Sequence, residues 1–419
     1  MIVALLAVSA FLNYVDRQAL SLLAAPIQRD LNIDDVGYGH LVSAFLIAYT
    51  LFNLVAAWIV DRLGARVGLA LFVGWWSFAG AMSGFAQNVH QMLVTRFALG
   101  MGEVGNWVAT PKLVREWFTP KDWALGIGLC TAAAMIGATL SPYLITGLAD
   151  NVGWRGTFWL TGAVGFAWVA MWFLIYGPKR IPPFLTAPAT PQGHKPSFKE
   201  EWPDWRGLIA SPALWLLTVA EILTGPVWFF YLFWFPKYLT DERGMSVAAM
   251  GEQTWVVYAA AGIGALTGGI LSGQLIRRGA SPPRARLIIM TIAAVAAPIG
   301  ALNAWEPGVN TSIALGALVA ICHMVWLTNL TALKVDLFPA QHLGKAFGMI
   351  ALIGGIASVA STQAIGHLVQ TITYRPMFIV VAIAYPAALV AAFFATRASS
   401  LDPTITAVAP AGPSQAATT

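Results

Sequence analysis

Four ionisable residues stand inside two apolar stretches of the chain. Asp16 and Arg17 lie in the first stretch, and Arg96 and Glu103 lie in the fourth. Arg96 and Glu103 are seven residues apart, about two helical turns, so they share one helical face. An ionised group in an apolar span costs several kcal/mol and is kept where it is paired or functional. Two bases and two acids can neutralise one another, and together they could bind an anion and exchange a proton.

Such a set of charges can couple two ligands. A carboxylate that enters competes for an arginine, and the acid that it displaces sees less positive charge and takes up a proton more readily. Anion and proton are then thermodynamically linked without touching each other. The alternative is that Arg96 with Glu103, or Asp16 with Arg17, only locks two helices together.

The elements that position these charges must lie in a membrane. Of the 419 residues, 58% are hydrophobic and 10% are charged, and the mean hydropathy is +0.69. Soluble proteins carry roughly 25% charged residues. This composition excludes a large soluble enzyme and a disordered protein. The net charge of +5 does not indicate a nucleic-acid binder, because the basic residues do not cluster on one soluble face.

Apolar runs of bilayer-spanning length recur along the whole chain. A helix that crosses a bilayer needs about 20 mostly apolar residues. Twelve runs meet this requirement: 2–25, 38–60, 67–86, 92–111, 124–147, 156–177, 211–236, 248–275, 286–304, 308–332, 346–368 and 376–396. The sequence therefore predicts twelve membrane helices.

A polar stretch divides these runs into two sets of six. Residues 178–210 are rich in proline and charge and predict a cytoplasmic linker. It separates an N-terminal six-helix bundle (1–177) from a C-terminal one (211–397), and residues 398–419 predict a disordered cytoplasmic tail. With both termini in the cytoplasm, 17 of the 24 basic residues, Lys334 among them, fall in cytoplasmic segments and 5, Lys237 among them, fall in outside loops, as the positive-inside rule requires. We expect a monomer that crosses the inner (plasma) membrane many times.

Polar residues also interrupt the runs of the second half. His323, Trp326 and Asn329 recur at intervals of three, so they roughly share one face of the tenth run. His323 and Asn329 could bind hydroxyl groups of a substrate or hold helices together. Glu221, ten residues into the seventh run, has no evident cationic partner and could be a third titratable site or line a water-filled space. Gln363 in the eleventh run is a further candidate.

No motif for a cofactor, a metal or an enzymatic reaction is evident. Cys130 and Cys322 lie far apart in apolar runs and predict two buried free thiols. Glycine-rich segments such as 262–269 follow no strand, so they favour close helix packing over nucleotide binding. The chain has no Walker motif, which argues against ATP as an energy source. An intramembrane enzyme or a receptor would need a nucleophile–base pair, a metal cluster or a soluble domain, and none is visible.

The sequence resembles the major facilitator superfamily. The resemblance rests on the six-plus-six helix pattern, the central linker and the loop DRLGAR (61–66). Of the pattern G-x-x-x-D-R-x-G-R/K, the loop keeps Asp61, Arg62 and Gly64, and its basic residue, Arg66, stands one position later; Ala57 replaces the first glycine. The resemblance implies an all-α membrane fold with twelve transmembrane helices in two pseudo-symmetric six-helix bundles. It also implies that this loop has a gating role.

Longer segments are similar to the anion:cation symporter family. They include NYVDRQALSLLAAPI (13–27) and RFALGMGEVGNWVATPKLVREWF (96–118). GEVGNW (102–107), WSFAG (76–80) and HMVWLTNL (323–330) are most similar to the hexuronate transporters of that family. This implies proton-coupled uptake of an acidic sugar such as galacturonate or glucuronate, without a cofactor. Carriers of an aldonate such as galactonate, of tartrate or of an aromatic carboxylate are the alternative.

The resemblance also implies roles for individual residues. Helices 1 and 4 line the central cavity in this superfamily, so the four charges would converge there. Asp16 and Glu103 would carry protons, with Arg96 tuning Glu103. The substrate would contact polar and aromatic residues: Arg17, Tyr14, Tyr49, Asn106, Trp107, His323 and Asn329. Packing or helix–helix contact is the alternative for the tyrosines, Asn106 and Trp107. Ala134 stands where sugar-acid relatives have a glutamine, so helix 5 contacts are in question.

Overall fold

The computed structural model describes residues 1–118, 123–177, 206–338 and 340–401, and these residues form helices joined by short turns. The first half comprises α1 (Ile2–Leu22), α2 (Ala24–Leu31), α3 (Asp35–Leu63), α4 (Ala65–Ser83), α5 (Val89–Trp117) and α6 (Trp123–Ile175). The second half comprises α8 (Pro212–Phe229), the π-helix η2 (Phe230–Trp234), α9 (Phe235–Asp241), α10 (Val247–Gln253), α11 (Trp255–Arg277), α12 (Pro282–Ala296), the 3₁₀-helix η3 (Ala297–Trp305), α13 (Val309–Leu337), α14 (Ala340–Thr371) and α15 (Arg375–Leu401). The predicted linker and tail fall mainly on 178–205 and 402–419, which lie outside the described residues.

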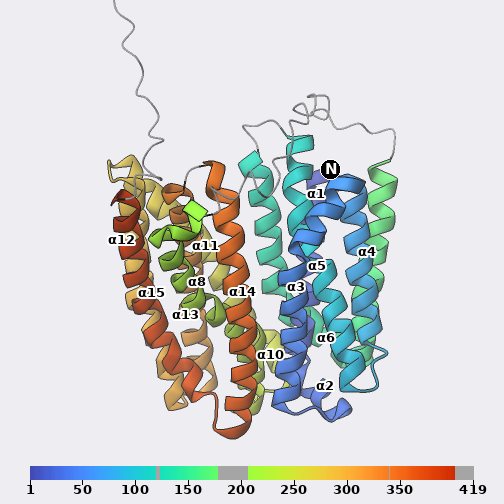
Figure 1. The fold of residues 1–419 in the computed structure, drawn as a ribbon. Helices are drawn as coiled ribbons and strands as arrows, with labels where there is room; N and C mark the ends of the chain where they lie inside the picture. Colours follow the sequence, from blue (N-terminus) through green and yellow to red (C-terminus); the bar gives the residue numbers. More distant parts are fainter. Residues whose placement is uncertain (119–122, 178–205, 339, 402–419) are drawn as a thin grey trace, which may run out of the picture.

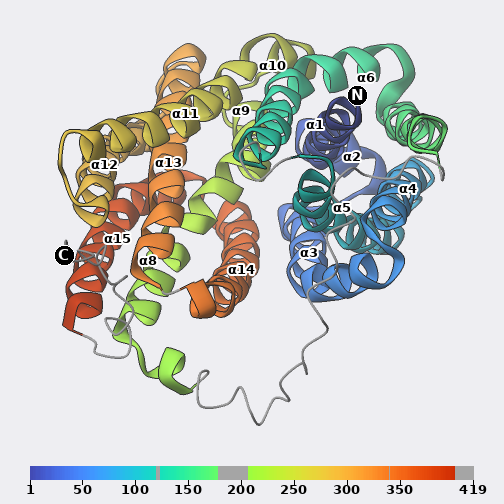
Figure 2. The same ribbon diagram turned by 90° about the horizontal axis from the view of Figure 1, so that it is seen from above.

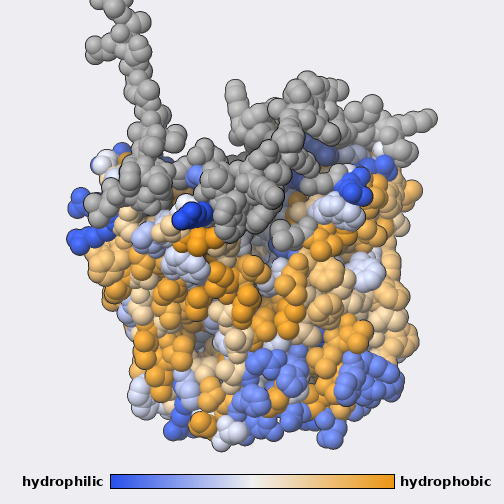
Figure 3. Space-filling model, viewed as in Figure 1, coloured by the Kyte–Doolittle hydropathy of each residue, from blue (hydrophilic) through white to orange (hydrophobic). Residues whose placement is uncertain are grey.

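The helices are long and apolar enough to form a membrane protein. Within the described ranges, nine segments meet a membrane-span criterion, and one of them, 126–175, is long enough for two crossings. The helices α1 and α5 are not among the nine, and they carry the four predicted charges. Counting these two and the double segment gives the twelve predicted crossings. Figure 3 shows a broad apolar band across the visible face of the molecule, with hydrophilic residues at the lower edge of the band.

The label α6 covers two helices, the fifth and sixth predicted runs, which meet at Gly153, where φ is +71°. Glycine tolerates this left-handed conformation because it has no Cβ. The seventh run is interrupted by the π-helical turn η2, and helix resumes in α9 as far as Asp241. Sequence periodicity does not reveal such a turn, because it inserts one residue without changing the apolar character.

The helices gather into two bundles (Figures 1 and 2). The chain begins and α15 ends at the same end of the molecule, which we call the terminal end; α2 lies at the opposite end, which we call the α2 end (Figure 1). The bundles contact each other along two seams, one between α3 and α14 and the other between α6 and the pair α10–α11. Glycines bring the backbones close at both seams: an added Cβ at Gly39 would lie 3.3 Å from the Thr362 carbonyl, and one at Gly251 would lie 3.0 Å from the Pro142 carbonyl.

Gly100 sets the distance between α3 and α5 next to the buried charges. A Cβ added there would lie 2.4 Å from the carbonyl oxygen of Phe45, so α3 would have to move. We expect Gly100→Ala to cost about 1–3 kcal/mol through overpacking and to lower the apparent melting temperature in detergent. Gly147→Ala is the matched control, because a Cβ at Gly147 meets no atom within 4 Å. Equal melting temperatures for the two variants would contradict this account.

Candidate functional site

A ladder of polar side chains joins α1 to α5. Ser9, Asn13 and Arg17 are spaced four residues apart, so they form one stripe along α1. The Ser9 hydroxyl donates to Asn106 Oδ1 at 2.9 Å, and Asn13 Nδ2 donates to the Glu103 carbonyl at 3.2 Å. Arg17 Nε donates to Glu103 Oε2 at 2.8 Å. Asn106 is thereby part of the helix interface, and Glu103 has its ion pair with Arg17.

Arg17 is only partly satisfied by this pair. Its Nη2 donates weakly to Asn13 Oδ1 at 3.4 Å, and its Nη1 has no hydrogen bond to the residues that the structure describes. The side chain keeps 8% exposure, whereas Glu103 is fully buried. One edge of the guanidinium is thus available to a further acceptor. A planar guanidinium with a free edge matches the geometry of a carboxylate.

Aromatic rings surround the Arg17 guanidinium. Its carbon lies 4.9 Å from the Tyr49 ring centre, 5.1 Å from that of Tyr14 and 5.4 Å from that of Phe45. Trp107 meets Tyr14 edge to face at 6.4 Å, and both rings are half-buried. These contacts hold the guanidinium through cation–π attraction and leave ring faces beside it. The structure therefore brings Arg17, Glu103, Tyr14, Tyr49 and Trp107 together.

Asp16 and Arg96 lie on another side of the same bundle. Arg96 Nη2 donates to the Ser83 hydroxyl of α4, and its guanidinium carbon lies 5.1 Å from the Phe158 ring centre of α6. Asp16 lies within electrostatic range of Arg96 and near the Thr161 side chain. Both charges are buried away from the aromatic rings around Arg17. The four predicted charges thus form two groups, because consecutive residues on a helix point about 100° apart.

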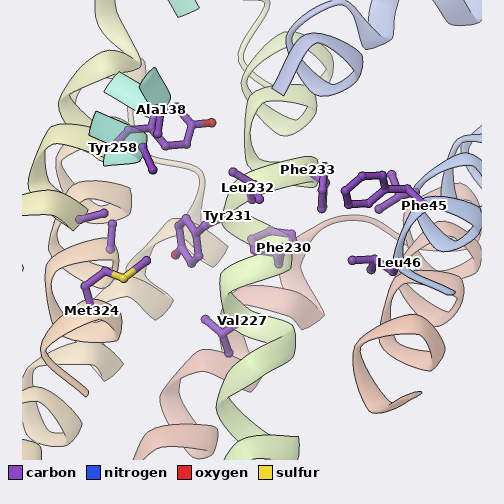
Figure 4. Packing of buried hydrophobic residues seen from close by; sticks show 14 of the residues in the cluster. Phe45, Leu46, Ala138, Val227, Phe230, Tyr231, Leu232, Phe233, Tyr258 and Met324 are labelled. Atoms are coloured by element: carbon purple, nitrogen blue, oxygen red, sulfur yellow. The ribbon is translucent and has the colours of Figure 1, made fainter. Parts of the chain in front are cut away.

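An aromatic layer lies between Arg17 and the α2 end. Phe45 of α3 faces Phe233 of η2 at 6.1 Å, which joins the two bundles (Figure 4). Tyr38, two turns earlier on α3, donates its hydroxyl to the Phe233 carbonyl at 2.7 Å and meets Trp234 edge to face at 5.0 Å. A π-helical turn shifts the register of carbonyls, so one of them can accept a bond from a side chain. The layer thus depends on the π-turn of η2.

A charged network closes the α2 end beyond this layer. Lys237 of α9 is 4% exposed and lies 2.8 Å from Asp35 of α3, in the other bundle. It also pairs with Asp241, which accepts from the Tyr374 hydroxyl at 2.9 Å. The positive-inside analysis placed Lys237 in an outside loop, and the structure instead buries it between carboxylates. Tyr38–Phe233, Asp35–Lys237 and Asp34–Gln370 join the two bundles by hydrogen bonds or an ion pair at this end.

The polar residues of α13 bind neighbours in their own bundle. His323 Nδ1 is 2.7 Å from the Tyr385 hydroxyl, and its ring stacks on Trp228 at 5.3 Å. Trp326 Nε1 donates to the Thr224 hydroxyl at 3.1 Å. Asn329 Nδ2 donates to the Gly268 carbonyl at 3.1 Å.

These contacts leave the α13 residues apart from the Arg17 group. His323 and Asn329 are buried and belong to the other bundle, so the structure does not join them to Arg17. Gln363 lies half-buried on α14. Ala134 is fully buried in α6, and the neighbouring amide Gln18 of α1 donates to the Ala138 carbonyl at 3.2 Å.

Glu221 has a cationic partner, contrary to the sequence-based expectation. Lys334 Nζ lies 2.6 Å from Glu221 Oε2. The tenth run was expected to end at residue 332, which placed Lys334 in a loop, but α13 continues to Leu337 and buries it. The two residues are 113 positions apart in sequence, so spacing alone could not pair them.

The loop between α3 and α4 has the conformation that its glycine predicts. Gly64 has φ of +78° and ends α3, a conformation that other residues adopt at a cost. Arg66 packs over Tyr176 and Phe173 at the end of α6, and its carbonyl accepts from Trp172 Nε1 at 3.0 Å. Arg62 stacks on Trp58 at 4.4 Å. The Asp61 side chain lies outside the described part of the structure.

Comparisons with known proteins agree with this architecture. The sequence profile of the Major Facilitator Superfamily matches residues 6–305. The chain belongs to the major facilitator superfamily. Among solved structures of this fold, a mutant of the nucleoside transporter NupG matches with a TM-score of 0.73 and 14% identity, over 95% of this chain and 100% of that one. The xylose transporter XylE from E. coli, in its inward open conformation, matches with a TM-score of 0.71 and 14% identity, over 94% of both chains.

Within the superfamily, the chain is related to transporters of sugar acids. The hexuronate transporter of Bacillus subtilis (strain 168) is 28% identical over 90% of both chains. The D-galactonate transporter of Escherichia coli O6:H1 is 26% identical over 89% of both chains. The protein is therefore a multi-pass membrane transporter of the major facilitator type and not an enzyme.

Four residues that matter to the site were not singled out by the sequence. Lys334 and Lys237 were counted as loop charges, although each stands at the end of an apolar run, where a long side chain can fold back. Phe45 and Phe233 belong to aromatic-rich runs and carry no sequence signal that separates them from other apolar residues. A partner for Glu221 could have been sought among cations at helix ends.

Proposed function

We propose that the protein takes up an acidic sugar together with protons by alternating access, with a hexuronate such as galacturonate or glucuronate as the first candidate. The observation that carries this proposal is the half-satisfied Arg17. Its Nε is held by Glu103, and its Nη1, which has no acceptor among the described residues, lies beside half-buried aromatic rings. This arrangement suits a substrate that brings a carboxylate and an apolar ring face.

Competition for Arg17 supplies the coupling. A substrate carboxylate that binds Arg17 faces the buried Glu103 carboxylate, and two adjacent anions in a desolvated site repel each other. A proton on Glu103 removes this repulsion and leaves the guanidinium to the substrate. Proton and anion therefore favour each other's binding by the same factor.

The second group of charges, Asp16 and Arg96, stabilises the proton-loaded and empty forms of the bundle. Arg96 lies within electrostatic range of both Asp16 and Glu103. When Glu103 is protonated, Arg96 keeps a balancing anion in Asp16. This proximity of opposite buried charges supports a role for Asp16 as a further proton carrier and for Arg96 as the residue that tunes Glu103.

The rest of the substrate contacts the rings and hydroxyls near Arg17. The Tyr14 and Tyr49 hydroxyls can donate to carboxylate or sugar oxygens. The half-buried Trp107 offers a face to the C–H groups of a sugar ring. His323 and Asn329 now form hydrogen bonds to neighbours in their own bundle. They can contact a substrate at Arg17 only after the bundles rearrange.

Closure at the α2 end supports alternating access. With both termini in the cytoplasm, as the basic residues favour, the α2 end faces outward and the present arrangement is closed to the outside. Opening the outer end must break the Asp35–Lys237 ion pair and the Tyr38–Phe233 hydrogen bond. In this proposal the protein works as a monomer in the inner membrane, and the DRLGAR loop controls the opposite end.

The outer network should bias the protein toward this closed form. We expect Asp35→Asn to speed outside labelling of a cysteine introduced at Thr362 about fivefold or more, since loss of an ion pair with a buried partner costs about 1 kcal/mol or more. The labelling rate is measured in intact cells with a membrane-impermeant maleimide, in a protein whose Cys130 and Cys322 are replaced by serine. Arg375→Gln, in an exposed pair with Glu306, should leave the rate unchanged. Equal labelling in Asp35→Asn would remove the gate assignment.

Uptake into proteoliposomes tests the substrate and the coupling. Galacturonate, glucuronate, galactonate, galactarate and benzoate would be compared by counterflow and by uptake driven by an inward proton gradient. The proposal requires hexuronate counterflow, and hexuronate accumulation that collapses with the gradient. Counterflow of another anion alone would transfer the assignment to that anion, and accumulation that ignores the gradient would remove proton coupling.

An aldonate is the second candidate. The 26% identity to a D-galactonate transporter over 89% of both chains favours it. An aldonate is an open chain, so it would use the hydroxyl donors more than the Trp107 face. A Trp107→Leu variant that loses galacturonate but keeps galactonate counterflow would separate the two modes of binding.

A further inference from the structure

A second ion pair, with a buried lysine and a half-buried glutamate, lies in the C-terminal bundle, apart from the Arg17 group. Glu221 of α8 and Lys334 of α13 meet at 2.6 Å, and their side chains are 20% and 7% exposed. The carbon chain of Glu221 packs against Gly354 of α14, where an added Cβ would lie 2.7 Å from Glu221 Cγ. Lys334 Nζ lies 5.5 Å from the ring centre of Phe347, also on α14. The pair is well packed, and its carboxylate remains partly accessible.

The two ion pairs join equivalent helices of the two bundles. Arg17–Glu103 joins the first and fourth crossings of the N-terminal half, which are α1 and α5. Glu221–Lys334 joins the first and fourth crossings of the C-terminal half, which are α8 and α13. The order of charges is reversed, with the cation on the fourth crossing. A pseudo-symmetric transporter places these helices around one shared central path.

The pairs lie at different depths along that path. Arg17 follows Ile2 by 15 residues and Glu103 precedes Trp117 by 14. At about 1.5 Å per residue both are about 21–22 Å from the terminal end. Glu221 follows Pro212 by 9 residues and Lys334 precedes Leu337 by 3, which puts them about 14 Å and about 5 Å from that end. Glu221 is therefore about 8 Å and Lys334 about 17 Å closer to the terminal end than the first pair.

The helix behind the second pair also forms the seam with the other bundle. Gly354 of α14 packs on Glu221, and the next residue, Gly355, packs on Thr50 of α3, with an added Cβ 2.7 Å from the Thr50 hydroxyl. The other charged pair of α13, Arg286–Asp336, is directed to α12 and does not compete for Lys334. Lys334 is thus a buried cation close to the bundle seam, held by one exchangeable carboxylate.

We propose that Lys334 is a second carboxylate-binding position, which the substrate anion occupies between Arg17 and the terminal face, and that Glu221 fills this position when substrate is absent. The inference rests on the proposed transport of a sugar acid. On leaving Arg17 toward the terminal end, the carboxylate displaces Glu221 from Lys334, as it displaced Glu103 from Arg17. The step exchanges one ion pair at Lys334 for another, and the displaced Glu221 carboxylate, whose side chain is 20% exposed, is left in a partly accessible place.

Measurements from the two faces separate this role from a structural one. Uptake in intact cells reports the outer face, and uptake into inverted membrane vesicles reports the terminal face. The probe is radiolabelled galacturonate, or the member of the panel that the wild type carries best. We expect the double variant Glu221→Gln with Lys334→Gln to raise the terminal-face KM about tenfold, the value of one charge-assisted contact. The outer-face KM should stay within about twofold.

The single variant Glu221→Gln should act in the opposite direction. It frees Lys334 from its competitor, so the terminal-face KM should fall about threefold to tenfold. A pair that only holds α8 to α13 cannot produce this gain. Arg375→Gln is the control, because it removes one cation from an exposed pair of the same bundle. Both variants must reach wild-type levels in the membrane and elute as a single peak in detergent.

The outcomes distinguish the two proposals. A wild type that carries no member of the panel contradicts the proposed function itself. A wild type that transports, with an unchanged terminal-face KM in the double variant or a raised one in Glu221→Gln, overturns the role of Lys334 and leaves the proposed function intact.

Discussion

Arg17→Lys is expected to reduce initial uptake of the sugar acid at least about 100-fold, or about 2.7 kcal/mol, while expression stays normal. Lysine keeps the positive charge but loses the planar fork. The Nε bond to Glu103 at 2.8 Å and the free Nη1 edge belong to one rigid group, and an ammonium cannot serve both directions from one position. Lysine also loses the stacking on Tyr14 and Tyr49.

The matched control for this substitution is Arg155→Lys. Arg155 also pairs with a carboxylate, Asp30, at 2.8 Å, and also stacks on an aromatic ring, Trp154 at 4.2 Å, but it is partly exposed. We expect uptake by this variant to stay within about twofold of the wild type, because exposed pairs contribute about 0–1 kcal/mol. Near-wild-type transport by Arg17→Lys would remove Arg17 from the substrate role.

Glu103→Gln is expected to separate exchange from accumulation. Glutamine resembles a carboxyl group that is permanently neutral, so Arg17 is always available to the substrate. Counterflow should therefore persist within a few-fold, while accumulation driven by a proton gradient should fall severalfold or more. Uptake should also lose most of its dependence on pH, since the acid that competes with the substrate is gone and Asp16 alone is left to exchange a proton.

Asp16→Asn is the comparison for Glu103→Gln. Both changes neutralise one buried acid, but Asp16 lies with Arg96 and Thr161, away from the rings around Arg17. If Glu103 is the residue that competes with substrate, only Glu103→Gln should raise the apparent affinity in counterflow. Proton-driven accumulation by Glu103→Gln at the wild-type level would contradict the coupling mechanism.

The sequence alone determined the membrane class and the number of crossings. In lipid, the backbone N–H and C=O groups of an apolar run of about 20 residues must be hydrogen-bonded within the protein. An α-helix satisfies them within the run itself. The sequence also pointed to α1 and α5 through Asp16, Arg17, Arg96 and Glu103, because a charge in an apolar run is rare and stands out. The left-handed conformation of Gly64 can also be predicted from the sequence, since the loop motif places a glycine at that turn.

Tertiary structure alone decided which charges meet. Spacing groups Arg96 with Glu103 on one face of α5, but Glu103 has its ion pair with Arg17 of α1, and Arg96 is directed to α4 and α6. The partners of Glu221 and Asp35, which are Lys334 and Lys237, come from helices far away in sequence. Such contacts depend on the rotation of each helix about its axis and on its depth in the bundle. Close packing across many residues sets both quantities, and the periodicity of a single segment does not contain them.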